Sequence, residues 1–223
     1  MKIACLADIH GFLPVVPECD LLLIAGDFIP MTMPSARLQQ SWLEVEFASW
    51  LRNSPAGKIV AVAGNHEFIF QNRKDLIPNN LRWTYLENSS TYQCGLKIWG
   101  SPYQLNYSDW AFNAPRVGGE DYLDKLYSQI PEDTDIIISH GPPSGYNLDY
   151  SPDGKNGMGC HALAQHIARV KPKLVVAGHI HSGRLFSPIT QEWDKEKKTI
   201  LVGASYLNER RVPFNMPIQV IEL

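Results

Sequence analysis

Short runs of apolar residues recur along the chain, and stretches with helical periodicity separate several of them. The runs lie at residues 3–7, 21–25, 59–63, 136–139 and 174–177. Continuous apolar runs of this length are typical of strands that are buried on both faces. Strands that alternate with helices predict an α/β fold.

Two segments have the periodicity of amphipathic helices. In the first, residues 35–52, the apolar stripe consists of Leu38, Trp42 and Val45, widened by Leu43, Phe47, Trp50 and Leu51. We interpret its two tryptophans as core residues rather than as a surface for stacking a substrate. The second helix is expected from about residue 159 to just before Pro172, with Leu163, Ile167 and Val170 facing the core.

The last third of the chain has no long helical pattern. Residues 183–189, 199–204 and 217–223 have the pattern of strands joined by turns, which predicts antiparallel strands that continue the sheet. The charged residues 194–198 are expected in a solvated turn. No repeat or linker marks a boundary, and 223 residues suffice for one well-buried core. We therefore predict a single domain over residues 1–223.

Composition and charge exclude several classes of protein. The net charge of -3 offers no basic surface for a nucleic-acid polymer. No apolar run approaches the ~20 residues of a membrane span, and the first residues enter a strand pattern at once, without a signal peptide. The four cysteines are widely spaced, which favours reduced thiols. These features predict a cytoplasmic protein that binds neither membranes nor nucleic-acid polymers, and they leave the oligomeric state open.

Side chains that can bind metal ions follow all five apolar runs. In chain order they are Asp8 and His10, then Asp27, then Asn65 and His66, then His140, and finally His179 and His181. In open α/β sheets, ligands bind beyond the carboxyl ends of the strands, so we expect these residues to converge on one edge of one sheet. Residues two apart in an extended segment point the same way, which would align Asp8 with His10.

The donor atoms of this set favour metal ions over other ligands. Two carboxylates, an amide oxygen and several imidazoles, without a thiolate, suit Mn, Fe or Zn better than a cysteine-rich structural zinc. The donors are too many for one tetrahedral ion, whereas two ions about 3.5–4 Å apart that share a carboxylate would use them all. Each residue alone can be explained as a cap, a turn residue or a hydrogen-bonded histidine. Their coincidence after five strands predicts a metal site.

The same residues resemble a known family. Asp8-x-His10, Gly26-Asp27, Gly64-Asn65-His66-Glu67, His140-Gly141 and Gly178-His179-Ile180-His181 resemble, in order, the five motifs of the calcineurin-like metallophosphoesterases. Further similarity, to the metallophosphoesterase-domain-containing branch, is carried by His140-Gly141-Pro142-Pro143, Gly159-Cys160 and Pro217-Ile218-Gln219-Val220. The resemblance implies an α/β/β/α sandwich of two mixed sheets flanked by helices, with the metal site at the carboxyl ends of the strands.

The resemblance also implies a role for each motif residue. One metal would be held by Asp8, His10 and His181, and the other by Asn65, His140 and His179. Asp27 would bridge the two metals, and a hydroxide shared by them would attack phosphorus in line. His66 would act on the leaving-group side as an acid or transition-state donor. The residues support this last role independently, because His66 is one imidazole more than two ions need.

Two positions depart from the family pattern. Pro30 stands where the family often has a second acidic residue that orients the catalytic histidine, so the partner of His66 is left open. Met31 stands where phosphoprotein phosphatases have a phosphate-binding arginine, which disfavours a protein-phosphatase role.

Arg73 and Arg184 follow two of the motifs closely and are candidates to contact phosphate oxygens, with solvated loops as the alternative.

The expected function is metal-dependent hydrolysis of phosphate esters, first of all small or cyclic-nucleotide-type phosphodiesters. The chain has no large insertion to cap the site and no basic groove, which favours a small substrate. Small phosphomonoesters are the alternative substrates. A catalytically weak scaffold that uses the same fold to bind partners is an alternative from another class. That scaffold would be expected to have lost ligand residues, whereas each ligand position here holds a suitable side chain.

Overall fold

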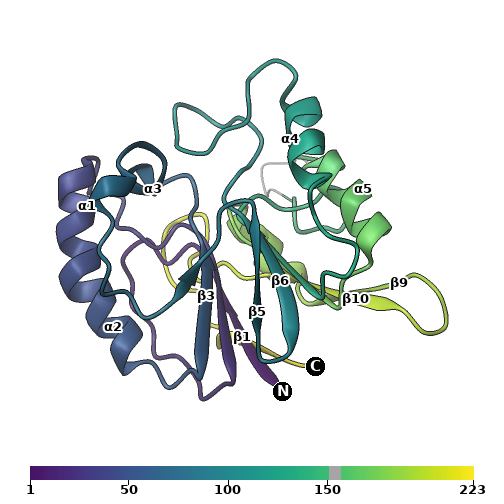
Figure 1. The fold of residues 1–223 in the computed structure, drawn as a ribbon, viewed down its shortest axis with the longest axis horizontal. Helices are drawn as coiled ribbons and strands as arrows, with labels where there is room; N and C mark the ends of the chain where they lie inside the picture. Colours follow the sequence, from purple (N-terminus) through teal and green to yellow (C-terminus); the bar gives the residue numbers. More distant parts are fainter. Residues whose placement is uncertain (151–156) are drawn as a thin grey trace.

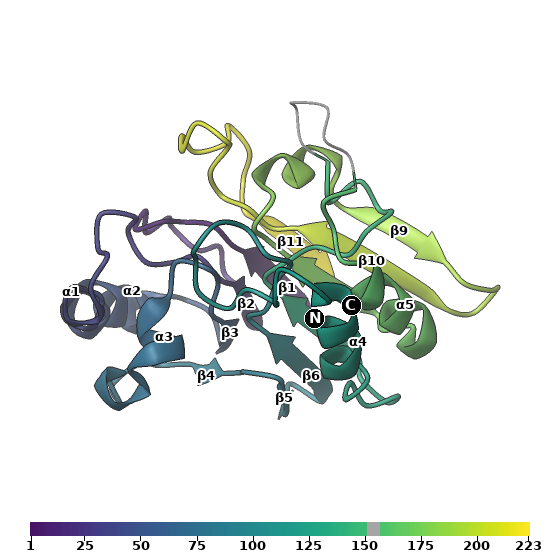
Figure 2. The same ribbon diagram turned by 90° about the horizontal axis from the view of Figure 1, so that it is seen from above.

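Two β-sheets pack face to face, and helices cover the outer face of each sheet (Figure 1 and Figure 2). The computed structural model describes residues 1–150 and 157–223. The first sheet has the order β11-β1-β2-β3-β4 and consists of β1 (Lys2–Leu6), β2 (Leu21–Ala25), β3 (Lys58–Val62), β4 (Thr84–Tyr85) and β11 (Gln219–Glu222). The second has the order β5-β6-β7-β8-β10-β9 and consists of β5 (Ser89–Gln93), β6 (Leu96–Ser101), β7 (Ile136–Ser139), β8 (Leu174–Ala177), β9 (Ile189–Glu192) and β10 (Lys198–Gly203). The two-sheet sandwich of mixed sheets flanked by helices is confirmed.

Interior strands run parallel and some edge strands run antiparallel. In the first sheet β1, β2, β3 and β4 are parallel, and β11 pairs antiparallel with β1. In the second, β6, β7, β8 and β10 are parallel, with β5 and β9 antiparallel at the edges. The carboxyl ends of the parallel strands therefore lie along one edge of each sheet.

The β1–β11 pair also brings the two ends of the chain together. The ammonium group of Met1 donates to the carbonyl oxygen of Leu223 at 2.7 Å, and the N–H of Leu223 donates back to Met1 at 3.1 Å. Both ends lie side by side in Figure 1. They are at the amino end of β1, whereas the motif residue Asp8 follows its carboxyl end.

Each central strand is buried on both faces, which explains the continuous apolar runs. In β2, Leu21 and Leu23 pack between the sheets, whereas Leu22 and Ile24 pack under the helices of the first sheet. In β7, Ile138 lies between the sheets and Ile137 faces the helices of the second sheet. The strands predicted from these runs are confirmed.

The helices form the two outer layers of the sandwich. The first sheet is covered by α1 (Ala36–Trp42), a π-helical segment (Leu43–Phe47), α2 (Ala48–Asn53) and α3 (Phe68–Asn72), and the second by α4 (Gly119–Tyr127) and α5 (His161–Val170). The buried face predicted for α5 is confirmed, because Leu163, Ile167 and Val170 are buried. Among the described residues no helix is long and apolar enough to cross a membrane.

The helical segment over residues 35–52 is confirmed, but its predicted apolar stripe is partly wrong. Leu38 and Val45 are 51% and 62% exposed. The buried row runs instead through Gln39, Leu43, Phe47 and Leu51, which are four residues apart. Because Gln39 is polar, the pattern of apolar residues did not indicate that this row is the buried one. The amide of Gln39 is buried because it bonds three backbone groups, of Met33, His66 and Ile69.

The tryptophans of this segment pack as core residues. Trp42 is buried and stacks on Phe47 with ring centroids 5.2 Å apart. Trp50 also stacks on Phe47, with ring centroids 5.5 Å apart, and its indole N–H donates to the carbonyl oxygen of Pro14 at 2.8 Å. Both rings therefore stabilise the helix against the first sheet rather than binding a ligand.

The strand expected at residues 183–189 is wrong. The segment His181–Phe186 is a 3-10 helix, and the strand β9 begins only at Ile189. A Cβ atom at Gly183 would collide with the backbone of Leu148, so this turn needs a residue without a side chain. The other two C-terminal strands are confirmed as β10 and β11. The antiparallel prediction holds for β11 but is partly wrong for β10, which is antiparallel to β9 and parallel to β8.

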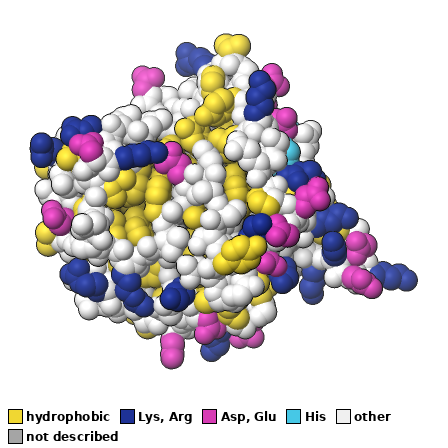
Figure 3. Space-filling view, viewed as in Figure 1, with side chains coloured by type: hydrophobic (Ala, Val, Ile, Leu, Met, Phe, Trp, Pro, Cys, Tyr) yellow, Lys and Arg dark blue, Asp and Glu magenta, His cyan; other side chains and the backbone are white. Residues whose placement is uncertain are grey.

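The charged residues 194–198 are exposed and lie where β9 turns into β10, as predicted. On the face drawn in Figure 3, Lys and Arg side chains are interspersed with Asp and Glu and form no continuous basic surface. Very little histidine surface is visible there.

Candidate metal centre

Loops from both sheets build one polar site. Asp8, Asp27 and Asn65 follow β1, β2 and β3 of the first sheet, and His140 and His179 follow β7 and β8 of the second. The expectation of one edge of one sheet is therefore wrong. The two sheets join at this edge through the backbone, because Ala7 donates to Ala204 at 2.9 Å and Ala204 donates to Ala177 at 2.7 Å.

The backbone at the site is not extended. Asp8, His10, Asp27 and His179 have φ values of 50°, 42°, 54° and 66°. The argument that a two-residue spacing aligns Asp8 with His10 in an extended segment is therefore wrong. Non-glycine residues are uncommon in this left-handed region and concentrate at functional sites, where the surroundings impose the conformation.

Asp8, His10 and His181 form the first group of ligand-type side chains, which we call the Asp8 group. Their donor atoms lie within 4.8 Å of one another, and His181 Nε2 is 3.6 Å from Asp8 Oδ1. The Nδ1 atom of His181 donates to the carbonyl oxygen of Asn208 at 3.0 Å. In the neutral ring this leaves the Nε2 lone pair directed at the group, as a metal ligand requires.

Asn65, His140 and His179 form the second group, which we call the Asn65 group. The Oδ1 atom of Asn65 lies 2.9 Å from His140 Nε2 and 2.7 Å from His179 Nδ1. His140 Nδ1 donates to the carbonyl oxygen of Ala25 at 2.8 Å, so its Nε2 is an acceptor in the neutral ring. Acceptor atoms this close to one another suit a shared cation, because metal ligands at ~2.1 Å are typically about 3 Å apart.

Burial keeps two of these imidazoles neutral. It lowers the pKa of His10 to about 2 and the pKa of His179 to about 3, because charging either ring would place a cation among other buried groups. A neutral imidazole is the form that binds metal ions. Both groups therefore fit divalent ions by donor chemistry and by spacing.

Asp27 lies between the two groups. Its Oδ1 is 3.4 Å from His140 Nε2, and its Oδ2 is 3.8 Å from His10 Nε2. Burial alone would raise its pKa, but the imidazoles of His140, His66 and His10 lower the pKa below its ordinary value. The carboxylate can thus face a cation in either group.

Glu67 holds the loops that carry Asp27 and Asn65. It is fully buried and accepts backbone N–H bonds from Asp27 at 2.8 Å, Gly64 at 2.5 Å and Ile29 at 3.0 Å. Burial and the nearby Asp27 carboxylate raise its pKa well above the ordinary value. Glu67 stands within the third motif, but its role could not be assigned from the sequence, because its three partners become apparent only in the folded chain.

Gly64 allows this close packing. A Cβ atom there would collide with Oδ1 of Asp27 and would lie 2.6 Å from the ring of His140. Any side chain at this position would displace the central carboxylate. The glycine of the third motif is therefore required by the site itself.

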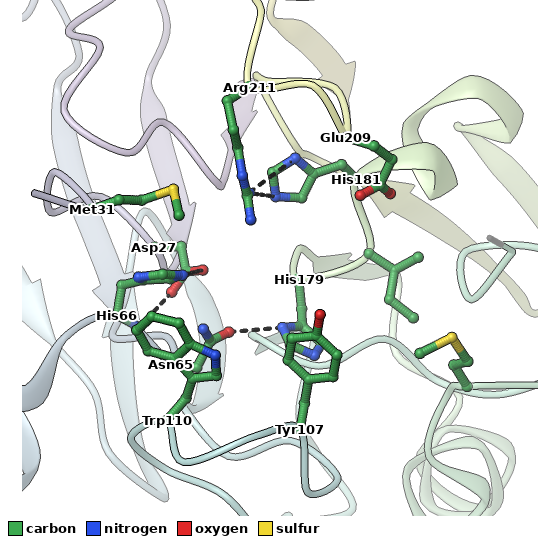
Figure 4. A pocket seen from close by; sticks show the side chains of 12 residues that line it. Asp27, Met31, Asn65, His66, Tyr107, Trp110, His179, His181, Glu209 and Arg211 are labelled. Carbon is green, nitrogen blue, oxygen red and sulfur yellow. Dashed lines mark hydrogen bonds and ion pairs between the residues drawn. The ribbon is translucent and has the colours of Figure 1, made fainter. Parts of the chain in front are cut away.

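His66 lies beside Asp27 on the open side of the site. The backbone N–H of His66 donates to Asp27 Oδ1 at 2.9 Å, and the side-chain amide of Gln39 donates to the carbonyl oxygen of His66 at 2.9 Å. Its ring packs on Trp110 with centroids 4.2 Å apart, as Figure 4 shows. Burial lowers the pKa of this imidazole below its ordinary value.

Within residues 1–150 and 157–223, His66 has no carboxylate partner at hydrogen-bond distance, and Pro30 supplies none. Among the described residues, neither ring nitrogen of His66 makes a hydrogen bond, and the carboxylate oxygen Oδ2 of Asp27 is 3.8 Å from Nε2. Pro30 itself packs against Gly11. Trp110, from a loop that no sequence motif connects with the site, instead holds the ring.

A cavity of about 450 Å³ opens over the site (Figure 4). Its polar wall includes Asp27, Asn65, His66, His179 and His181, and its apolar wall consists of Met31, Tyr107, Trp110, Met158 and Ile180. Glu209 and Arg211 complete the lining.

The structure brings neither of the arginines proposed from the sequence to this cavity. Arg73 is exposed and forms an ion pair with Asp75 at 2.7 Å. Arg184 is buried elsewhere and donates to the carbonyl oxygen of Pro217. The arginine of the cavity is Arg211, which lies well beyond the last motif, where no sequence pattern pointed to the site.

Comparison with known proteins gives concordant matches. A family model described as calcineurin-like phosphoesterase matches residues 1–183. Metallophosphoesterase domain-containing protein 1 of Homo sapiens and that of Mus musculus are each 33% identical over 250 aligned positions, which cover 100% of this chain and 71% of theirs. The crystal structure of TT1561 of Thermus thermophilus has a TM-score of 0.52 and 16% identity, over 91% of this chain and 88% of that one. The last likeness concerns the fold alone.

Proposed function

Because this chain belongs to the calcineurin-like phosphoesterase family, we propose that it is a binuclear metallophosphoesterase that hydrolyses small phosphodiesters. The family match supports a metal-dependent phosphoesterase. The observation that carries the binuclear assignment is the place of Asp27, whose two carboxylate oxygens face His140 of one ligand group and His10 of the other.

Each ligand group would hold one divalent ion, with Mn, Fe and Zn as the candidates. The Asp8 group and the Asn65 group would each supply three ligands, and Asp27 would serve both. Bound divalent ions would activate a water molecule as the nucleophile and neutralise charge on the phosphoryl oxygens.

The side chains around the ligand groups would orient the substrate. His66 would direct its ring toward the leaving oxygen, and Trp110 would fix the plane of that ring. The apolar wall would bury an organic substituent on the ester and exclude water from it. A cavity of about 450 Å³ suits a small molecule better than a polymer, and its aromatic side chains suit a nucleoside or another ring system.

The bridging role of Asp27 leads to the first prediction. Asp27→Asn is expected to lower the metal content from about two ions per chain, because a neutral amide bridges two cations poorly. Elemental analysis of the purified, metal-loaded protein measures this loss. Asp75→Asn is the matched control, since it removes a carboxylate that is exposed and paired with Arg73. An active wild-type preparation with one metal or none per chain would rule out the binuclear site.

The substrate class leads to the second prediction. Metal-loaded protein is expected to hydrolyse nitrophenyl phosphodiesters well and unstrained alkyl diesters slowly, because no carboxylate of the described residues hydrogen-bonds to the His66 ring and supports proton donation to a poor leaving group. A cyclic diester should react faster than its linear alkyl counterpart, because ring strain assists bond cleavage. The measurement is kcat/KM across a series of leaving groups, with matched monoesters alongside.

Two outcomes would change this assignment. A flat dependence of rate on leaving-group pKa, with chemistry rate-limiting, would mean that His66 is already an effective acid. Faster hydrolysis of the monoesters would favour the phosphomonoesterase. Absence of turnover on every ester, with both metals bound, would favour the partner-binding scaffold.

A further inference from the structure

Arg211 reaches into the cavity and contacts His181, as Figure 4 shows. It also contacts His10, which makes two of the three residues of the Asp8 group. We propose that its guanidinium competes with a metal ion for His10 and His181, so that the turn which carries Arg211 lowers the metal affinity of the Asp8 group. This inference rests on the metal site of the proposed function and adds a residue that limits the loading of one of its halves.

The competition follows from the contacts of a single nitrogen atom. Nη1 of Arg211 lies 2.8 Å from Nε2 of His10 and 2.6 Å from Nε2 of His181. A guanidinium is always charged, and its Nη1 carries two hydrogens, one for each imidazole lone pair. A metal ion would need the same two lone pairs at about 2.1 Å. The ion and Nη1 therefore cannot occupy this point together.

The turn that presents Arg211 is anchored to the ligand that Arg211 contacts. The carbonyl oxygen of Asn208 accepts from His181 Nδ1 at 3.0 Å and from the N–H of Arg211 at 2.8 Å. The side chain of Asn208 accepts from the N–H groups of Arg210 and Val212 at 2.9 Å and 3.2 Å. The orientation of His181 and the position of Arg211 thus depend on one residue.

Two further features indicate that this placement is functional. Arg211 has a φ of 59°, in the left-handed region that is uncommon for a non-glycine residue. Glu209 on the same turn accepts from the N–H and the hydroxyl of Ser182 at 3.2 Å and 3.1 Å, which ties the turn to the segment after His181. A strained residue on a doubly anchored turn is held toward the site.

The guanidinium can nevertheless leave the site readily. Arg211 is exposed as a residue, so its side chain can rotate toward solvent without disrupting the core. Its displacement by a metal ion would break two hydrogen bonds and return the charge to water. Arg211 therefore weakens metal binding without preventing it.

The competition is expected in only one half of the centre. Within residues 1–150 and 157–223, no Lys or Arg side chain hydrogen-bonds to Asn65, His140 or His179. The Asn65 group would consequently fill at a lower metal concentration than the Asp8 group. Two separate binding phases are the expected signature.

Calorimetric titration of the metal-free protein with Mn²⁺ tests this third prediction. The wild type should bind in two phases, and Arg211→Ala should tighten only the weaker phase, by about tenfold, which corresponds to the loss of two competing hydrogen bonds. The matched control is Arg210→Ala, which removes an exposed arginine from the same turn and should leave both affinities unchanged. Circular dichroism of both variants verifies that they are folded.

Added ethylguanidinium, at millimolar concentration, should weaken the tightened phase of Arg211→Ala and leave the wild type unaffected. An Arg211→Ala affinity equal to or weaker than that of the wild type would overturn the inference. Equal tightening of both phases would also overturn it, because a general loss of positive charge would then be the cause. If neither protein binds Mn²⁺, and neither binds Fe²⁺ or Zn²⁺ in the same titration, the metal site of the proposed function is itself wrong.

Discussion

Replacement of His66 by alanine is expected to lower kcat by ~10²–10⁴-fold, the usual range for a group that transfers a proton in the transition state. The ring faces the cavity beside Asp27, and both ligand groups have three side chains without it. Metal content should therefore stay near that of the wild type while turnover is lost. Steady-state kinetics on a phosphodiester, together with elemental analysis of the same preparation, measure both quantities.

A second histidine provides the control for this variant. His166→Ala removes a ring on α5 that is paired with Asp124 at 2.9 Å, outside the cavity, and should leave kcat unchanged. His66 also lies within ligand distance of His10 and Asp27, which makes a metal-binding role a concrete alternative. Loss of metal from His66→Ala, with turnover per bound ion unchanged, would establish that alternative instead.

Replacement of Glu67 by alanine is expected to lower the free energy of unfolding by about 3–5 kcal/mol, since a buried donor left without a partner costs roughly 1–3 kcal/mol. Three backbone N–H groups, of Asp27, Ile29 and Gly64, would lose their acceptor at once. Such a loss is a large part of the ~5–15 kcal/mol that stabilises a typical domain. Denaturant unfolding of metal-free wild type and variant measures the difference.

Glu67→Gln separates the loss of hydrogen bonds from the loss of volume. The amide oxygen can still accept from Asp27 and Gly64, whereas the amide nitrogen would face the N–H of Ile29. We expect an intermediate loss of stability for this variant. A Glu67→Ala protein within about 1 kcal/mol of the wild type would show that solvent replaces the carboxylate at little cost.

The strands and the residues that follow them could be predicted because their signal is local. Leu22 and Leu23 are both apolar since β2 is buried on both faces, and this requirement does not depend on which strand lies alongside. The polar residues at the strand ends were visible against this background. The sequence thus indicated that Asp27 and His140 belong to one site before any contact was known.

What could not be predicted depends on contacts between distant segments. Gln39 is buried because its amide meets backbone groups near residues 33, 66 and 69, so a polar side chain stands in a core row and the apolar pattern misled. Arg211 enters the cavity because the carbonyl oxygen of Asn208 bonds both His181 and the backbone N–H of Arg211. A bond of this kind produces no periodic pattern in the sequence. The family resemblance implied two sheets, but the apolar runs alone did not, since strands of either sheet have the same pattern.

The antiparallel pairing of β1 with β11 has a practical consequence for handling the protein. The six residues 2–7 separate Met1 from Asp8, which at ~3.3 Å per residue is roughly 20 Å. An affinity tag, a fluorophore or a solid support attached at residue 1 or at residue 223 would therefore project from the edge of the sandwich opposite the cavity. Immobilised protein should keep its cavity accessible whichever end is used for attachment.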